Sequence, residues 1–269
     1  NGDLHSKRFT IKNLPKKNGG TQHKESADIK LDYEAGYYFG YYLAEGHCKL
    51  QDQKNNRSCQ VVFTYHQDED YMGTALDFAK AHCTSYKEKT ISSQNKIRTI
   101  IYGTYLAEMT SQWFGRVDSK RIPSWVFDAP KDFILGLIDG YYLGDGSKNE
   151  VGRVRAPSVH EKIARQLKRL VNSVTDGLCG LHYYERSRYG VPSKPVLVSA
   201  INGRAYDGLF GAPRESYRNE RFMTVNGKKF VKLRSITPAG QKQTYDIEVD
   251  HQDHDFETPV GIISNSEVA

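Results

Sequence analysis

The chain has 269 residues, 26% of them charged, and a formal net charge of +6. This length allows one large domain or two modest ones, and a mild positive excess suits a polyanionic partner without requiring one. We find no uninterrupted apolar run of about 18 residues and no signal peptide, so we expect a soluble, cytoplasmic protein with no membrane partner. The four cysteines show no CxxC spacing, which argues against a zinc site and against a disulfide scaffold.

Residues 1 to 32 are polar and basic, and residues 13 to 20 read NLPKKNGG, a turn-rich composition. This pattern predicts a solvated leader or linker. A basic arm that binds DNA is the less favoured alternative.

Two stretches 100 positions apart repeat each other, which predicts two similar half-domains. Residues 34 to 46 read EAGYYFGYYLAEG, and residues 134 to 146 read ILGLIDGYYLGDG. Small residues recur every four positions, so on a helix they form one face along which two backbones approach closely. Glycine inside a helix costs about 0.5–1 kcal/mol relative to alanine, so its use in both copies predicts that the two helices pack together. The glycines expected at this contact are Gly36, Gly40, Gly136, Gly140 and Gly144.

An acid ends each repeated helix, Glu45 in the first copy and Asp145 in the second. A carboxylate faces the unfavourable, negative end of the helix macrodipole there, so stability alone does not explain it. Two parallel helices would bring both carboxylates together, where they need a cation between them. The pattern predicts a site for Mg2+ or another divalent cation such as Mn2+, and the alternative is two unrelated solvated acids. Gly46 and Gly146 follow the acids and are expected to end the helices in the left-handed conformation.

These two stretches resemble the paired motifs of LAGLIDADG homing endonucleases, in the single-chain form that carries two motifs. The nine-residue motif falls on residues 38 to 46 and 138 to 146, with its metal-binding acid at Glu45 and at Asp145. The resemblance implies an α+β fold, a pseudo-symmetric duplicated αββαββα domain with halves at residues 33–120 and 121–220. It also implies a monomer that makes site-specific, metal-dependent cuts in double-stranded DNA.

The first half is expected to continue with strands and helices in alternation. Residues 59 to 65 and 96 to 102 read as strands because they are rich in β-branched and aromatic side chains. Residues 68 to 81 have helical periodicity, and residues 106 to 114 predict a short helix that ends at Gly115.

Between the halves, residues 119 to 125 read SKRIPSW. This segment resembles the Lys-x-Ile-Pro block that precedes the second motif in intein-borne homing endonucleases. The resemblance places Lys120 near the scissile phosphate, where an ammonium group stabilises negative charge or orients a water. The alternative is an ordinary surface lysine. The second half shows no equally clear lysine.

In the second half, residues 158 to 174 predict a basic amphipathic helix, residues 182–189 and 195–201 predict strands, and residues 207–210 predict a short final helix. A two-stranded ribbon fits the DNA major groove, so basic residues on these strands are candidate DNA contacts, the alternative being a solvated sheet face. The candidates are Arg153, Arg155, Arg186, Arg188 and Lys194.

The C-terminal region changes character, because short strand-like runs alternate with turns from residue 221 onward. Residues 245–249 (YDIEV), 253–256 (DHDF) and 261–266 (GIISNS) resemble the C-terminal splicing segment of an intein of the DnaE type. The resemblance implies a small all-β, Hint-type segment at residues 221–265, with residues 266–269 as the start of the host protein.

Four residues carry the splicing chemistry that this resemblance implies. Asn265 cyclises through its side-chain amide, and the hydroxyl of Ser266 accepts the acyl group beforehand. His254 maps to the proton-transfer histidine and Asp246 to its supporting acid. Because Asn1 is no splicing nucleophile, we expect splicing to need an N-terminal intein half in trans.

Two alternatives to an intein-encoded endonuclease stay open at this point. The chain is an inactive nucleic-acid-binding module of the same fold, or a degenerate intein remnant whose endonuclease is dead. Intact acids at both motifs disfavour the first alternative, and the sequence does not exclude the second.

Overall fold

The structure is a computed structural model with two compact units, Asn1–Asn219 and Glu220–Ala269. The described residues are 4–11, 26–50, 59–69, 71–148, 154–174, 178–188, 191–202, 222–225, 228–231, 233, 235, 237–238, 240–241, 255–258 and 261–264.

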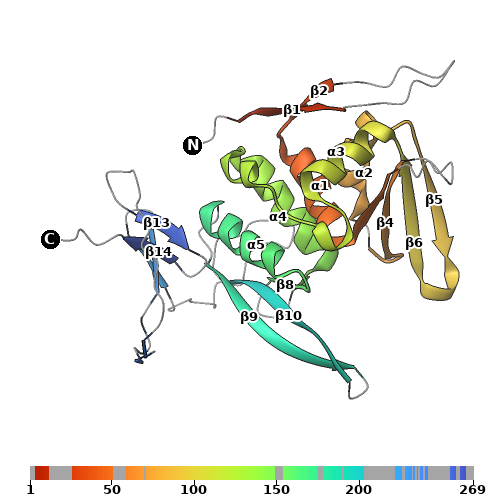
Figure 1. Ribbon diagram of the computed structural model, residues 1–269. Coiled ribbons are helices and arrows are strands. Elements are labelled where there is room, and N and C mark those ends of the chain that lie inside the picture. Colours follow the sequence, from red (N-terminus) through yellow and green to blue (C-terminus); the bar gives the residue numbers. More distant parts are fainter. Residues whose placement is uncertain are drawn as a thin grey trace. The chain divides into compact units, whose positions relative to one another are not determined.

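The first half of the larger unit has the expected order αββαββα (Figure 1). Its elements are α1 (Tyr33–Glu45), β3 (Gly46–Lys49), β4 (Gln60–His66), α2 (Met72–His82), β5 (Ser85–Ile91), β6 (Lys96–Tyr102) and α3 (Thr104–Phe114). The four strands form an antiparallel sheet in the order β3-β4-β6-β5.

The second half repeats this pattern. Its elements are α4 (Lys131–Asp145), β7 (Ser147–Lys148), β8 (Val154–Ser158), α5 (Glu161–Val174), β9 (Leu178–Arg188) and β10 (Val191–Asn202). They form an antiparallel sheet in the matching order β7-β8-β10-β9. The short helix expected at residues 207–210 lies outside the described residues. The duplication inferred from the repeated sequence is therefore present in the first six elements of each half.

Helices α1 and α4 run parallel and in direct contact at the centre of the unit (Figure 1). A Cβ atom on Gly36 would overlap the carbonyl of Phe133, and one on Gly140 would overlap the carbonyl of Tyr37. Gly40 and Gly136 face partner carbonyls in the same way, and a Cβ on Gly144 would lie 2.6 Å from that of Ala44. Only glycine allows this backbone approach, which explains why its cost in helix propensity is tolerated.

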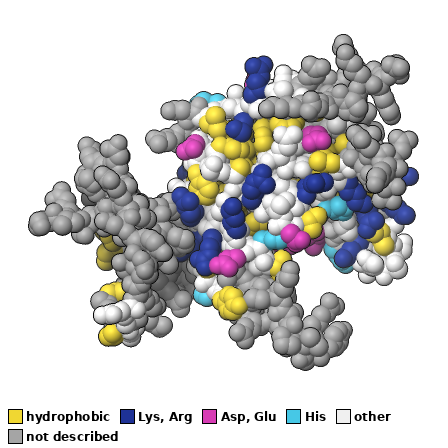
Figure 2. Space-filling view, viewed as in Figure 1, with side chains coloured by type: hydrophobic (Ala, Val, Ile, Leu, Met, Phe, Trp, Pro, Cys, Tyr) yellow, Lys and Arg dark blue, Asp and Glu magenta, His cyan; other side chains and the backbone are white. Residues whose placement is uncertain are grey.

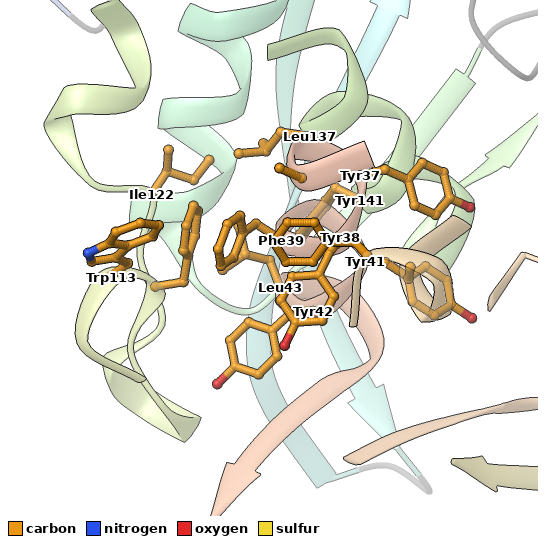
Figure 3. Close-up of a cluster of buried hydrophobic side chains, with 14 of the residues drawn as sticks. Tyr37, Tyr38, Phe39, Tyr41, Tyr42, Leu43, Trp113, Ile122, Leu137 and Tyr141 are labelled. Carbon is orange, nitrogen blue, oxygen red and sulfur yellow. The ribbon is translucent and has the colours of Figure 1, made fainter. Parts of the chain in front are cut away.

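Aromatic side chains fill the space around α1 (Figure 3). Phe39 stacks on Phe114 with ring centroids 4.2 Å apart. Two of these buried tyrosines have partners for their hydroxyl groups, since that of Tyr38 lies 2.9 Å from Thr110 Oγ1 and that of Tyr37 donates to the carbonyl of Tyr71 at 2.8 Å. The large tyrosine content therefore serves ordinary packing of the core.

The segment predicted as a solvated leader contains an antiparallel pair, β1 (Ser6–Thr10) and β2 (Ser26–Lys30). Phe9 and Ile29 are buried, and the ring of Phe9 packs edge-on against those of Tyr105 and Trp113. The described part of this segment thus belongs to the core. The prediction failed because a single buried residue per five-residue strand leaves no periodic signal.

The helix ends differ from the sequence-based expectation. Gly46 has φ −89° and ψ 153°, and Gly146 has φ −94° and ψ 168°, so both are extended rather than left-handed. The chain passes from each helix directly into a strand, which requires extended backbone. A Cβ on Gly46 would still lie 2.5 Å from a ring atom of Tyr42, so close approach, not a positive φ, favours glycine there.

The described residues of the smaller unit form two hairpins, β11 (Phe222–Val225) with β12 (Lys228–Val231) and β13 (Asp255–Thr258) with β14 (Gly261–Ser264). Within the described ranges of the whole chain, no helix has the length and apolar character needed to cross a membrane.

Candidate active site

The two repeated acids end the two central helices, Glu45 as the last residue of α1 and Asp145 as the last residue of α4. A Cβ added to Gly144 would lie 3.2 Å from Cγ of Glu45, so the two helix ends meet here. Burial first, and then the nearby charges of Asp145 and Glu69, raise the pKa of Glu45 to about 7 against the opposing effect of Lys120 and Lys96. The charge of Asp145 therefore acts on Glu45 across the helix pair.

The pKa of Asp145 is raised as well. Burial raises it to about 6, while the ammonium of Lys120 opposes the rise. Both carboxylates would be more stable with a cation close by. Their hard oxygen atoms are the ligand type that Mg2+ prefers, so the pair fits a divalent cation. Among the described residues no group of three His, Cys, Asp or Glu side chains suited to a metal is present.

Lys120 lies with the two acids. Its Nζ donates to the carbonyl oxygens of Tyr42 at 3.0 Å and Leu43 at 2.9 Å, and it stands 5.1 Å from the centre of the Tyr42 ring. These carbonyls belong to the negative C-terminal end of α1, which favours a cation. Burial lowers the pKa of Lys120 to about 8, and the charges of Asp145 and Glu45 oppose that change.

A tight loop positions Lys120. Tyr42 donates its hydroxyl to the carbonyl of Gly115 at 2.7 Å, and the turn η2 (Val117–Ser119) follows. After Lys120, the backbone N–H of Ile122 donates to Oε1 of Gln166 on α5 at 3.2 Å. The lysine is therefore fixed on one side by the first motif and on the other by the second half.

Sequence reasoning missed Glu69, which lies in the turn after β4. Its Oε2 accepts the backbone N–H of His66 at 3.1 Å, and its charge raises the pKa of Glu45 and of Tyr41. The hydroxyl of Tyr41 is buried and has no hydrogen-bond partner in the part of the chain that the structure describes. Two polar groups of the first half, the Glu69 carboxylate and the Tyr41 hydroxyl, thus lie in the surroundings of Glu45. A single glutamate in a turn offers no pattern by which it could have been found.

A basic face on the first sheet was also missed. Side chains of paired residues share a face, and Arg98 pairs with Thr64 and with Lys89. Thr99, the next residue of β6, is buried against the helices, so Arg98 faces away from them. The face that carries Arg98 holds Lys49, Lys87, Lys89, Lys96, His47 and His66. Glu88, the one acid in these four strands, pairs with Thr99 and lies on the opposite face.

Positive charge is not confined to this sheet. Figure 2 shows Lys and Arg side chains across the face where α4 and α5 lie in Figure 1. On α5, Arg165 pairs with Glu161 at 2.6 Å and Lys162 is exposed. Net charge alone does not therefore locate a binding face, and what distinguishes the first sheet is the absence of acids from its basic face in strands β3, β4, β5 and β6.

The basic residues predicted for the second half are only partly described. Arg155 lies on β8, is partly exposed, and pairs with Ser147 and Ala200. In the backbone register Arg186 pairs with Ser193 and Arg188 with Val191, whereas Lys194 lies in the irregularity that follows Ser193. The side chains of these three residues, and all of Arg153, lie outside the described part.

All four splicing residues, Asp246, His254, Asn265 and Ser266, also lie outside the described residues. Their predicted roles stay predictions.

Comparison with models of known protein families finds no match. The chain is 35% identical over 126 residues to the DNA-directed RNA polymerase subunit Rpo1C of Methanocaldococcus jannaschii, across 45% of this chain and 13% of that protein. It is 29% identical over 146 residues to the DNA polymerase of Thermococcus kodakarensis, across 54% of this chain and 8% of that protein. It is 28% identical over 137 residues to transcription initiation factor IIB of Methanocaldococcus jannaschii, across 49% of this chain and 18% of that protein. The chain thus spans less than a fifth of each of these relatives.

Among solved structures, the chain is similar to the homing endonuclease I-DmoI in complex with DNA and Mn, with a TM-score of 0.45 and 16% identity over 64% of this chain and 90% of that one. It is also similar to the N-terminal LAGLIDADG domain of DUF199/WhiA, with a TM-score of 0.40 and 13% identity over 63% of this chain and 76% of that one.

Proposed function

We propose that the larger unit is a LAGLIDADG-type endonuclease that makes site-specific, metal-dependent double-strand cuts in DNA. The observation that carries the proposal is the meeting of Glu45, Asp145 and Lys120 at the C-terminal ends of two parallel, pseudo-symmetric helices. Two carboxylates in equivalent positions suit two equivalent strands, as in duplex DNA. The motif resemblance of the sequence supports the same conclusion.

The chain's own residues have distinct parts in this chemistry. Glu45 and Asp145 would hold Mg2+, which supplies charge stabilisation to the scissile phosphate and to the attacking water. Two carboxylates leave most of the coordination shell of Mg2+ to water and phosphate oxygens. Lys120, with its pKa near 8, is mostly protonated at pH 7 and stabilises the negative charge that develops on the phosphate.

The basic face of the first sheet is the proposed binding surface for the duplex. Lys49, Lys87, Lys89, Lys96 and Arg98 share that face with no acid from the same strands. Strand β3 begins directly after Glu45 and strand β7 two residues after Asp145, so each sheet starts at the end of a motif helix, next to the proposed catalytic centre. A duplex lying along both sheets would present its backbone to the acids, and phosphate contacts would dominate its affinity.

We further propose that the chain is an intein, with the endonuclease inserted ahead of a C-terminal splicing segment. Relatives with unrelated names each match over a small share of their own length, which is what an inserted element in different hosts would produce. The run YDIEV, DHDF and GIISNS supports splicing residues at Asp246, His254, Asn265 and Ser266.

The endonuclease proposal is tested by cleavage of a plasmid library with randomised inserts in the presence of Mg2+. We expect discrete sites to be cut by the wild-type chain, with Glu45→Gln, Asp145→Asn and Lys120→Met each reducing the rate about a hundredfold or more. Asp77→Asn on α2, where Asp77 pairs with Lys80, is the matched control and should cut normally. Unchanged cleavage by both acid variants would refute the metal assignment.

The same assay distinguishes the alternative, a module that binds without cutting. Retention of particular library members by the wild-type chain, with no cleavage in Mg2+ or Mn2+, would support the alternative. If the wild-type chain neither retained nor cut any library member, the result would support the alternative of a degenerate intein remnant.

The splicing proposal needs a separate experiment. When the chain is mixed with a DnaE-type N-terminal intein half, we expect ligated product in the mass spectrum. Asn265→Ala should leave a branched or unspliced species because release requires cyclisation of the asparagine, and His254→Ala should slow the same step. Absence of both ligation and cleavage after Asn265 with several N-terminal halves would rule out an active splicing segment.

A further inference from the structure

Val117 has a backbone conformation that its side chain disfavours. Its φ is +44°, and apart from Asn95 it is the one non-glycine residue with positive φ in the described part of the chain. Asparagine tolerates this region, whereas a β-branched residue there is strained because its Cβ crowds the backbone. Strain of this kind persists where the surrounding structure imposes it, and it is common at functional sites.

The hydrogen bonds of the loop impose the conformation. The carbonyl of Arg116 accepts the backbone N–H of Ser119 at 2.8 Å and its hydroxyl at 2.7 Å. Gly115, which precedes Arg116, also has a positive φ of +79°. Its carbonyl accepts a hydrogen bond from the hydroxyl of Tyr42. The side chain of Val117 is nevertheless 63% exposed, so it gains little from core packing. Glycine or asparagine would suit the backbone better, and the folded chain alone gives valine no advantage.

The loop lies at the proposed catalytic centre. Val117 precedes Lys120 by three residues, and Lys120 is bonded to the last turn of α1, which ends at Glu45. A duplex whose phosphates reach the two acids must pass this end of the helix pair. If the flanking sheets lie in major grooves, the groove over the helix ends is the minor groove, because the grooves alternate along one face of DNA.

We propose that Val117 is a minor-groove contact, whose isopropyl group packs against deoxyribose or base edges between the two cut phosphates. Apolar side chains serve in this way in minor-groove binding. Arg116 and Lys120 lie on either side of Val117 in the chain, and their positive charges favour a phosphate backbone near this loop. The inference rests on the proposed function, since it needs a duplex at this end of the helices.

The test compares Val117→Gly and Val117→Asn with the wild-type chain on a duplex that the wild-type chain has selected from a randomised library. Both variants accept the left-handed backbone, so we expect their thermal midpoints to equal or exceed that of the wild type. We expect their affinity for the duplex to fall about tenfold, as for the loss of one buried aliphatic side chain. Hydroxyl-radical footprinting should show that protection of the central sugars is lost while protection of the flanks remains.

Val159→Asn is the matched control, because Val159 is 57% exposed and is not among the described residues with positive φ. It should keep the wild-type footprint. Wild-type affinity and footprint in both Val117 variants would overturn the inference and leave the proposed function intact. Loss of the folded state in both would also overturn it, because the backbone would then not be left-handed. Failure of the wild-type chain to select any duplex would instead refute the proposed function and the contact with it.

Discussion

At the scale of single residues, Glu45 shows a cost in stability that its proposed function explains. Its pKa rises from an ordinary 4.5 to about 7 on folding, mainly through burial, so the folded state favours the neutral acid. The stability contributed by the neutral form is complete below pH 4.5 and is lost as the pH rises through 7. A structural role alone would not select a buried acid with this property.

We therefore expect Glu45→Gln to stabilise the metal-free chain at pH 8 by on the order of 1–2 kcal/mol, a figure reduced to allow for solvent screening of a partly exposed group. The advantage should vanish near pH 4, where both side chains are neutral. Urea unfolding with a chelator present measures the difference at each pH. A variant less stable than the wild type at pH 8 would contradict the assigned cause.

The raised pKa values of Glu45 and Asp145 also predict how metal binding depends on pH. A cation held by both carboxylates displaces their protons, so affinity falls as the pH drops through about 7 for Glu45 and about 6 for Asp145. Between these values the loss should approach about tenfold per pH unit, for one proton displaced. Calorimetric titration of Mg2+ in buffers of different ionisation enthalpy counts the released protons. Binding without proton release at pH 6.5 would place the cation elsewhere.

At the scale of elements, the contact between α1 and α4 depends on glycines. Replacing one of them by alanine should destabilise the fold through steric overlap by more than the gain in helix propensity stabilises it. A Cβ on Gly40 would overlap the carbonyl of Leu137, which belongs to a rigid backbone. We expect Gly40→Ala to lower the free energy of unfolding by about 2–4 kcal/mol, in the range of overpacked cores and other large single-residue effects.

Gly73 on α2 is the matched control, because nothing lies within 4 Å of a Cβ added there. Gly73→Ala should be neutral or stabilise the chain by up to about 1 kcal/mol. Thermal unfolding of the two variants separates packing from propensity. If both changed stability in the same direction and by a similar amount, the close helix approach would not be the reason for the glycines.

The elements also show what sequence patterns can and cannot reveal. Strand β6 was predicted with its bounds because it is rich in β-branched and aromatic side chains, whereas β5 was missed because six of its seven residues are exposed and no alternation in polarity marks it. The basic sheet face was invisible for the same reason, since it forms only when β5 pairs with β6. The helix pair and its two acids were predictable because the same pattern of glycines and a final acid occurs twice in the sequence.

Helix starts were less predictable than helix centres. The helix expected from residue 68 begins at Met72, because Asp68 lies in a turn after β4, and the helix expected from residue 158 begins at Glu161. Lys120 was predicted through its motif, but its position on the carbonyls of α1 depends on a loop with two positive φ angles, which no sequence period encodes.

At the scale of the whole molecule, binding of DNA should depend on salt through the basic sheet face. We expect Lys89→Gln and Arg98→Gln each to weaken binding of a duplex and to reduce the slope of log affinity against log salt by about one. Lys162→Gln, an exposed lysine on α5, should leave that slope unchanged. Equal slopes for all three variants would remove this sheet from the binding surface.

The division of the chain into two units leads to the last prediction. The buried core runs from Phe9 to Cys179, and Glu45, Lys120 and Asp145 all lie in the larger unit, Asn1–Asn219. A chain shortened to residues 1–219 should therefore unfold in one cooperative transition and cut DNA within about twofold of the full-length rate, because it keeps all the described core residues and all three residues of the proposed endonuclease site. A chain shortened to residues 1–174 is the control. It lacks β9 and β10, which pack on α5 and complete the second sheet, and it should not fold. Circular dichroism and plasmid cleavage measure both outcomes, and loss of folding in the 1–219 chain would show that the smaller unit contributes to the fold of the larger one.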